Sequence, residues 1–302
     1  MSTPNGVMAD RSGIAERRQR GGTVWPTLRA IYIIWYRDVL RYWRDRTRLV
    51  ASLAQPLLFL VVFGTGLSSA LQGAGGGFGA GGGGAPAGFS YTQFIFPGII
   101  GMSVLFSAIF AAMSIVWDRE FGFLKEVLVA PIDRSAVAIG KALGGATQAM
   151  VQGLILLLLA PVIGVKLTLI SVISLVPLVF VLAFALSSMG VAIASRMRSM
   201  QGFQVVMNFL MMPIFFLSGA LFPLNGLPDW MTVLTRIDPA SYGIDPLRRV
   251  VLEGAGIPAA ALDRLGLTIG GTVLPILAEA GIMVAFGLLM LGIAVRNFRV
   301  PD

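Results

Sequence analysis

The sequence contains no cysteine and no histidine among its 302 residues. Without cysteine, a disulfide framework, a thiolate nucleophile and a cysteine-ligated zinc site are excluded. Without histidine, the serine-histidine triad, histidine-ligated metals and imidazole acid-base catalysis are excluded as well. Carboxylates, lysine, tyrosine and serine are the catalytic side chains that remain, so the composition argues against an enzyme.

Charged residues are scarce. They make up 13% of the chain, against about 25% in a soluble globular domain, and the mean hydropathy is +0.82. The net charge of +8 would suit a nucleic-acid partner, but the charges gather at the ends of apolar runs, which is typical of a membrane protein. We therefore expect an all-α integral membrane protein that binds membrane lipid and no nucleic acid.

Six stretches are long and apolar enough to cross a bilayer, which takes about 20 residues of helix. They are residues 49–71, 94–117, 136–165, 167–195, 200–222 and 272–295. Residues 49–302 are therefore predicted to form a six-helix transmembrane permease domain. A flexible basic tail at 1–25 and an amphipathic helix at 26–48 precede it.

Positive charge is spread unevenly around these spans. The first 48 residues hold ten arginines and no signal-peptide core, so we expect the N-terminus to be retained in the cytoplasm. Alternating the connections from there places 18 of the 23 Lys and Arg residues inside, in agreement with the positive-inside rule. The prediction is a multi-pass protein of the inner or plasma membrane with both termini cytoplasmic.

The amphipathic helix at 26–48 has one apolar side, with Leu28, Tyr32 and Tyr42 at helical spacing, and a stripe of arginines. Such a helix lies in the membrane interface. Its stripe faces either anionic headgroups or an acidic protein partner, and the two alternatives are compatible. The residues singled out are Trp35, Arg37, Arg41, Arg44 and Arg48.

The segment 118–131, between the second and third spans, is more apolar than a turn requires. It has an acidic start, apolar side chains on one face, a charged rim and a terminal proline. This pattern is typical of a helix that docks into a groove on another protein, although an ordinary surface helix fits it equally well. The candidate contact residues are Asp118, Glu120, Phe121, Gly122, Leu124, Lys125, Glu126, Leu128 and Pro131.

The connection after the fifth span is long and apolar. At 223–260 we expect two short helices that dip into the outer leaflet and return, broken at Asp238-Pro239. Glu279 is the only acidic residue inside a predicted span. It either senses substrate or carries a proton, or it reaches the interface or faces the wet inner surface of the outer helices.

Polar and aromatic residues in and beside the spans form a candidate path or gate. Interhelical hydrogen bonding is the alternative for the amide side chains among them. The candidates are Gln148, Gln152, Gln204, Asn208, Phe222, Trp230 and Glu279.

Two further segments bear on function. Nine of the twelve residues from Gly73 to Gly84 are glycine, which predicts a flexible linker in the first outer loop. Lys125, Lys141 and Lys166 are followed by Glu, Ala and Leu, so no lysine fits a G-x-x-x-x-G-K-[ST] phosphate-binding loop. If ATP drives transport, another chain hydrolyses it.

With these pieces in place, the sequence resembles the type 2 permeases of ABC transporters, particularly the branch typified by daunorubicin-resistance exporters. The resemblance extends from residue 26 to residue 298. The residues that carry it are Phe94-Ile95-Phe96-Pro97-Gly98-Ile99, Trp117 to Glu126, Ala130-Pro131, Leu217-Ser218-Gly219, Phe222-Pro223-Leu224, Leu227-Pro228, Pro239, Tyr242-Gly243 and Arg248.

The resemblance implies six helices per subunit, an interfacial helix, outer re-entrant helices, and a coupling helix at 118–131. It also implies two permease copies, as a homodimer, with two ABC ATPase subunits. ATP and Mg²⁺ bind to those partners, and this chain binds no cofactor. The expected function is ATP-driven export of a lipophilic drug, lipid or glycolipid.

Two alternatives stay open at this point. An ion-coupled secondary transporter would need intramembrane carboxylates or a repeat of broken helices. An intramembrane enzyme would need paired acids or a Ser/Lys constellation at membrane depth, and the sequence shows none.

Overall fold

The structure is a computed structural model that describes residues 24–67, 91–121, 133–165, 167–258, 262, 265–269 and 272–299. It is almost entirely helical, with one pair of two-residue antiparallel strands. The prediction of an all-α membrane fold is confirmed. The elements are α2 (Val24–Arg44), α3 (Arg46–Val61), the π-helix η1 (Val62–Leu67), α5 (Tyr91–Glu120), α7 (Arg134–Leu159), the 3-10 turn η2 (Ala160–Ile163), α8 (Leu169–Ala194), α9 (Met200–Leu217), α10 (Asp229–Ile237), α11 (Ser241–Gly254), β1 (Thr268–Ile269), β2 (Thr272–Val273) and α13 (Ile276–Arg299).

Five helices in the described part are long and apolar enough to cross a membrane: α5, α7 with η2, α8, α9 and α13. A sixth span results if α2 and α3, which meet at a bend of 71°, count as one broken span. In the region predicted as a first span at 49–71, the described residues form α3 and η1. A π-helix is uncommon, and here the carbonyl of Gly64 accepts a hydrogen bond of 2.8 Å from Thr92 Oγ1 at the start of α5.

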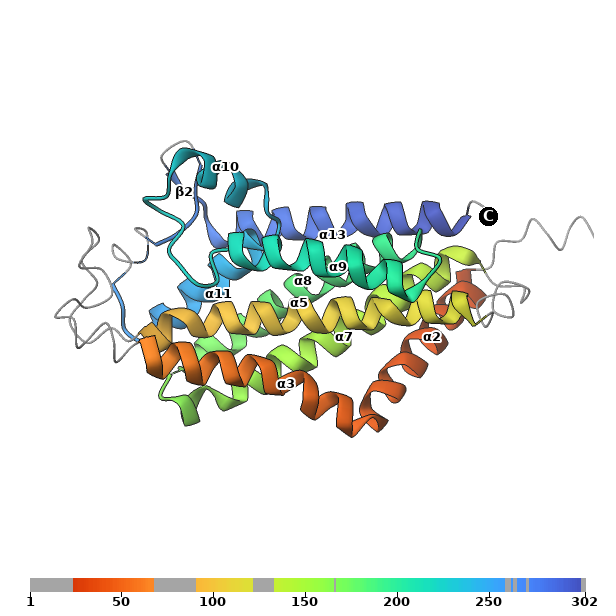
Figure 1. The fold of residues 1–302 in the computed structure, drawn as a ribbon, viewed down its shortest axis with the longest axis horizontal. Helices are drawn as coiled ribbons and strands as arrows, with labels where there is room; N and C mark the ends of the chain where they lie inside the picture. Colours follow the sequence, from red (N-terminus) through yellow and green to blue (C-terminus); the bar gives the residue numbers. More distant parts are fainter. Residues whose placement is uncertain are drawn as a thin grey trace, which may run out of the picture.

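The long helices run side by side along the long axis of the molecule (Figure 1). The start of α2 and the end of α13 lie at one end, which we call the α2 end. Helices α10 and α11 and strand β2 lie toward the opposite end, which we call the α11 end. The two ends therefore carry different accessory elements on one shared bundle.

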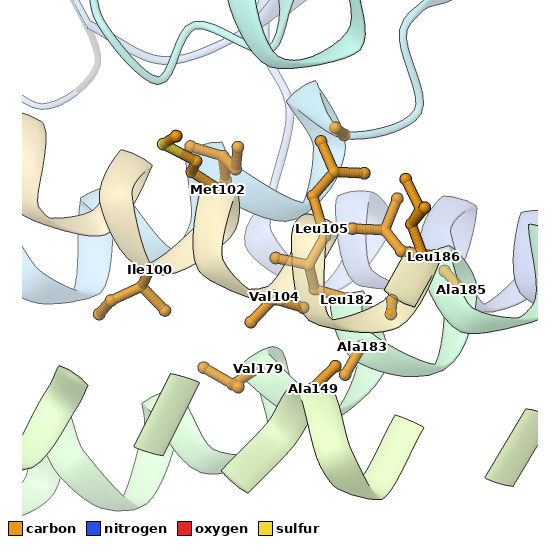
Figure 2. Packing of buried hydrophobic residues seen from close by; sticks show 14 of the residues in the cluster. Ile100, Met102, Val104, Leu105, Ala149, Val179, Leu182, Ala183, Ala185 and Leu186 are labelled. Carbon is orange, nitrogen blue, oxygen red and sulfur yellow. The ribbon is translucent and has the colours of Figure 1, made fainter. Parts of the chain in front are cut away.

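The bundle is held together by close packing of aliphatic side chains around α5. Figure 2 shows Val104 of α5 facing Val179 of α8 and Ala149 of α7. Gly153 of α7 lets these helices approach, since a Cβ atom there would lie 2.9 Å from Val179 and 3.0 Å from Val104. Small residues at such contacts are usual in membrane bundles, where van der Waals packing stabilises helix association.

Several element ends differ from the predicted segments. Helix α5 continues through Glu120, so Asp118 and Glu120 belong to its last turn and not to a separate helix. The last helix begins at Ile276 and not at residue 272, because residues 272–273 form β2 and Pro275 precedes the first helical residue. Glu279 therefore lies in the first turn of α13.

The connection after α9 contains the two short helices expected at 223–260. Pro228 caps the start of α10, and α11 follows after the break at Asp238. Buried residues run through most of α11, which packs against α5, α8 and α13. Helix α11 is thus an integral part of the bundle.

Candidate functional site

Helix α2 packs against α7 through every fourth residue. Ala30, Ile34, Asp38 and Tyr42 are buried, and a Cβ atom at Gly140 of α7 would lie 2.9 Å from Ile34 Cβ. Of the residues expected on the apolar side of this helix, Tyr42 belongs to the face that is buried against α7. Leu28 and Tyr32 are exposed, since close contact with the glycines of α7 selects the face that carries Asp38.

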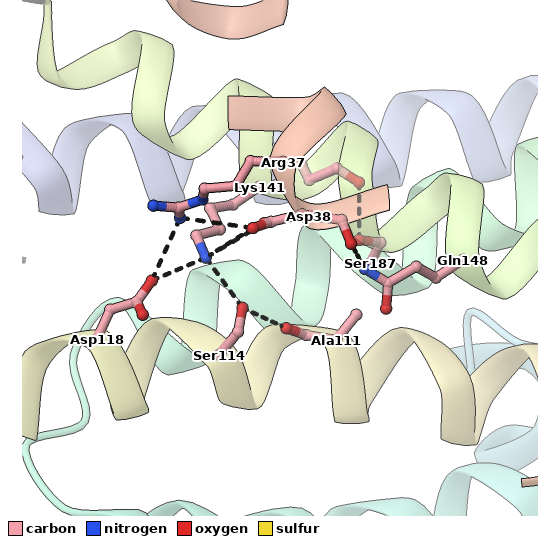
Figure 3. A network of polar contacts seen from close by, with 9 residues as sticks. Arg37, Asp38, Ala111, Ser114, Asp118, Lys141, Gln148 and Ser187 are labelled. Atoms are coloured by element: carbon pink, nitrogen blue, oxygen red, sulfur yellow. Dashed lines mark hydrogen bonds and ion pairs between the residues drawn. The ribbon is translucent and has the colours of Figure 1, made fainter. Parts of the chain in front are cut away.

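A buried lysine joins α2 to α5 and α7 (Figure 3). Lys141 Nζ lies 3.2 Å from Asp38 Oδ2 of α2 and 2.9 Å from Asp118 Oδ2 of α5, and it donates to Ser114 Oγ at 3.1 Å. These three partners match the three hydrogens of the ammonium group. A second cation, Arg37, lies 3.5 Å from Asp38 and 3.7 Å from Asp118. We call these four charged residues the α2-end cluster.

The last turn of α5 makes further contacts with the turn between α8 and α9. Arg119 donates to the Met197 carbonyl at 2.9 Å, and Glu120 Oε2 accepts from the Met200 amide at 2.9 Å. Because Met200 is the first residue of α9, the Glu120 carboxylate satisfies one of the free amides at that helix start. The end of α5 is thereby fixed to α8 and α9 as well as to α2 and α7.

Beyond this anchored turn, Phe121 is 70% exposed and stacks on Trp117 with ring centroids 5.5 Å apart. Across the segment 122–132, Asp133 caps α7 by accepting a hydrogen bond of 2.9 Å from the Ser135 amide, which lowers the pKa of its carboxyl. Both flanks of the predicted docking segment therefore have defined positions. The other predicted contact residues, Gly122, Leu124, Lys125, Glu126, Leu128 and Pro131, lie outside the described residues, as does the side chain of Arg48.

The two glutamines of α7 bind the region where α2 meets α3. Gln148 Nε2 donates to the Asp38 carbonyl at 3.3 Å. Gln152 Oε1 accepts from Tyr42 and from Ser52, both at 3.0 Å. Their contacts are interhelical hydrogen bonds, the alternative that the sequence left open for them.

A cavity of about 290 Å³ lies between α3 and α5. Tyr42 and Ser52, which donate hydrogen bonds to Gln152, belong to its lining. No charged side chain lines it. The buried Ser103 hydroxyl has no hydrogen-bond partner among the described residues. The lining residues are Tyr42, Ala51, Ser52, Gln55, Pro56, Ser103, Phe106, Ser107 and Phe110.

The remaining candidate path residues lie apart from this cavity. Gln204 and Asn208 are on the exposed face of α9, and Phe222 follows α9 in the connection to α10. Trp230 is exposed on α10. The structure therefore does not bring the predicted path residues together at one site.

Glu279 is fully buried and belongs to a second charged cluster, at the α11 end. Its Oε1 atom accepts a hydrogen bond from Arg249 Nη2 of α11. The same guanidinium donates to Asp245 Oδ2 at 3.0 and 2.5 Å and to the Leu274 carbonyl at 2.6 Å. Asp245 Oδ2 also accepts from the Leu267 amide at 3.0 Å. Glu279 thus faces α11, where it lies close to both the Arg249 guanidinium and the Asp245 carboxyl group.

The neighbouring Arg248 is buried and points elsewhere. It donates to the Gly219 carbonyl, and its guanidinium carbon lies 4.2 Å from the centre of the Phe94 ring. Helix α11 is thereby joined both to the start of α5 and to the turn after α9. We call Asp245, Arg248, Arg249 and Glu279 the α11-end cluster.

Sequence reasoning missed four of the eight members of the two clusters. Asp38 and Lys141 were not singled out, although Lys141 is a lone charge among apolar residues and Asp38 falls at the spacing of the buried residues of α2. Asp245 and Arg249 are an acidic and a basic residue at i,i+4 spacing, and this spacing in a predicted helix could have indicated the ion pair from the sequence. As for metals, no group of three potential Asp, Glu, His or Cys ligands occurs within the ranges that the structure describes.

The geometry defines a class: a multi-pass helical membrane protein whose helices are joined by buried charges at both ends of the bundle. The profile of the ABC-2 type transporter family matches residues 29–252, which is more than half of the chain. The chain therefore belongs to the ABC-2 type transporter family.

Individual relatives agree with this assignment. The transport permease ycf38 of Cyanophora paradoxa is 24% identical over 240 residues, which cover 79% of each chain. Nodulation protein J of Rhizobium leguminosarum bv. trifolii is 27% identical over 231 residues, 76% of this chain and 80% of the relative. The inner membrane transport permease YadH of Escherichia coli (strain K12) is 26% identical over 230 residues, 72% of this chain and 81% of the relative.

Proposed function

We propose that this chain is the transmembrane permease subunit of an ATP-driven ABC exporter, with ATP and Mg²⁺ bound and hydrolysed on a separate nucleotide-binding subunit. The observation that carries the proposal is the α2-end cluster. Asp118 lies in the last turn of the helix before segment 122–132, and Lys141 lies in the helix after it. A displacement of that segment would therefore be transmitted to α2, α5 and α7 through the ion pairs of Lys141.

In this proposal the α2 end faces the cytoplasm, together with both termini. Residues 118–131, which begin in the last turn of α5, act as the coupling segment and seat in a groove on the ATPase. Phe121 suits the role of an anchor, because it is a large aromatic side chain exposed next to an anchored turn. Aromatic anchors of this kind contribute most of the binding energy at many protein interfaces.

The working assembly is two permease copies, as a homodimer, with two ATPase subunits. Closure of the ATPases on ATP shifts the population of permease conformations toward an outward-open path between the copies. The contacts of Arg119 and Glu120 with the α8–α9 turn extend the same movement to α9.

The proposed cargo is a lipophilic drug, lipid or glycolipid. The cavity between α3 and α5 supports this class, because its lining offers hydroxyls and an amide for one polar group beside two phenylalanines and no charge. Sites of this composition suit neutral amphiphiles, and a charged solute would be desolvated there without compensation.

The test is substrate-stimulated ATPase activity of the permease-ATPase complex in lipid nanodiscs. We expect Phe121→Ala to lower the stimulated rate about tenfold or more, as for loss of an aromatic anchor, with unchanged membrane insertion. Val162→Ala is the matched control, since Val162 is also exposed but lies at the far end of α7 in η2. Equal stimulated rates in Phe121→Ala and wild type would refute the docking role.

A second measurement separates ATP-driven export from ion-coupled transport. Proteoliposomes that hold the complex are given either ATP or an imposed proton or sodium gradient. Uptake of a lipophilic probe with ATP and without a gradient is the expected result. Uptake that needs the gradient and no ATP would favour a secondary transporter.

A further inference from the structure

The arginine stripe of α2 borders an open groove of about 540 Å³ along the C-terminal half of that helix, next to the bend into α3. Arg37, Leu40, Arg41, Arg44 and Asp45 line it. Three cations against one carboxylate leave the groove with a net charge of +2. A ligand that complements it is an anion.

The spacing of the arginines favours a phosphate group. Arg37, Arg41 and Arg44 follow one another at i+4 and i+3, so they project from one side of the helix as neighbours. Arg41 and Arg44 form no salt bridge with any part of the chain that the structure describes. Guanidinium groups bind phosphate oxygens through paired hydrogen bonds, which makes several neighbouring arginines a phosphodiester site.

The surroundings of the groove favour a lipid over a soluble phosphate or an acidic protein. Leu40 lines the groove itself, and Tyr36 and Trp43 on the same helix are 50% and 63% exposed. Aromatic rings beside basic residues are typical of helices that lie at the membrane surface. Just past the groove, the chain bends by 71° into α3, so the arginines directly precede a helix that has the length and composition of part of a membrane span.

Arg37 belongs to the groove and to the α2-end cluster. It is 42% exposed and lies 3.7 Å from Asp118 at the end of α5. A phosphate in the groove would compete with Asp118 for this guanidinium. The charge balance around Lys141 would therefore depend on which lipid occupies the groove.

We infer that the α2 groove is a binding site for the phosphodiester headgroup of an anionic glycerophospholipid, with Arg41 and Arg44 as the principal contacts. The acyl chains lie along the exposed aromatic face of α2. This site is independent of the proposed coupling to an ATPase, because it needs only this chain and a membrane.

The experiment is native mass spectrometry of the detergent-purified full chain, titrated with phosphatidylglycerol or with phosphatidylcholine of the same acyl chains. We expect tighter binding of phosphatidylglycerol to the wild type. The double variant Arg41→Gln/Arg44→Gln should lose that preference, by about fivefold for each arginine removed. Arg29→Gln is the matched control, because Arg29 is exposed on the same helix and does not line the groove.

Three results would overturn the inference. One is equal loss of phosphatidylglycerol binding in Arg29→Gln and in the double variant, which would indicate unspecific attraction. Another is displacement of the lipid by millimolar inorganic phosphate, which would make the groove a simple anion site. The third is unchanged lipid binding in the double variant together with weaker association of the ATPase, which would assign the groove to a protein partner.

Discussion

The two charged clusters have the same composition and different surroundings. Each contains two basic and two acidic side chains: Arg37, Lys141, Asp38 and Asp118 at the α2 end, and Arg248, Arg249, Asp245 and Glu279 at the α11 end. The α2-end cluster includes a cation that reaches the surface, whereas all four members of the α11-end cluster are buried.

The hydrogen bonding differs as well. Lys141 finds a partner for each ammonium hydrogen. At the α11 end, Asp245 Oδ1 and Glu279 Oε2, together with two nitrogens of Arg248, have no partner among the described residues. Removing one partner of a buried ion pair is strongly destabilising. We therefore expect substitutions in the α11-end cluster to lower the stability more than substitutions in the α2-end cluster. The α2 end can rearrange, since Arg37 can approach the same carboxylates as Lys141.

The largest effect is expected from Arg249→Met. This substitution leaves the carboxylates of Asp245 and Glu279 buried without their shared cation. Arg248 cannot take the place of Arg249, because the Arg248 guanidinium donates to the Gly219 carbonyl. Loss of one partner from a buried ion pair costs about 3–5 kcal/mol. Thermal unfolding in detergent, followed by tryptophan fluorescence, measures the loss. Arg296→Met makes the same change at an exposed site and should stay within about 0.5 kcal/mol of wild type. An unfolding temperature equal to wild type in Arg249→Met would contradict the assigned role of the pair.

A smaller effect, about 2–3 kcal/mol, is expected from Lys141→Met. Arg37 lies within 4 Å of both Asp38 and Asp118 and can compensate in part. The compensation is measured by adding Arg37→Met in a double-mutant cycle. The double variant should be destabilised by more than the sum of the two single changes. If the two single changes add up to the effect of the double variant, Arg37 does not compensate the charges of Asp38 and Asp118 when Lys141 is lost.

The smallest effect concerns pH at the α11 end, where Asp238 lies between α10 and α11. Burial raises the pKa of its carboxyl to about 7, against the hydrogen bond from the Ala240 amide. Since the folded-state pKa lies above the unfolded value of about 3.9, this group's contribution is complete below pH 4 and is lost as the pH rises through 7. We expect a stability loss of about 2 kcal/mol between pH 5 and 8.

Asp238→Asn serves as the test of this pH response, because the amide keeps the shape of the side chain and cannot ionise. Unfolding temperatures recorded across the same pH range should then vary less than in the wild type. An identical pH profile in the variant would locate the response in another group.

The helices were predictable because their length and composition alone satisfy the requirement of the bilayer. The break at Asp238 and the two helices beyond α9 followed from proline placement. The ends of the helices were harder to predict. The second span was predicted to end at residue 117, but nothing in the sequence stops the helix there and α5 continues to Glu120. The last span was predicted to begin at residue 272, but residues 272–273 form β2 and α13 begins at Ile276.

The charged clusters could not be assembled from sequence because their members come from distant segments. Lys141 and Asp38 are 103 positions apart, and they meet because glycines on α7 allow α2 to approach. Periodicity gives the face of one helix and says nothing about which helix covers it. Phe121 is the reverse case: a local pattern selected it as a candidate contact residue, its side chain is exposed, and its contact role stays a prediction.

The hydrogen bond from Thr92 to Gly64 has a practical consequence for labelling the protein. It joins the two helices on either side of residues 68–90, so the ends of that segment are brought together by the bundle itself. Closing a loop costs little more when the loop is lengthened. The glycine-rich stretch from Gly73 to Gly84 is therefore a suitable place for an epitope or a fluorophore-binding tag, which would report on the sidedness of the chain in intact cells.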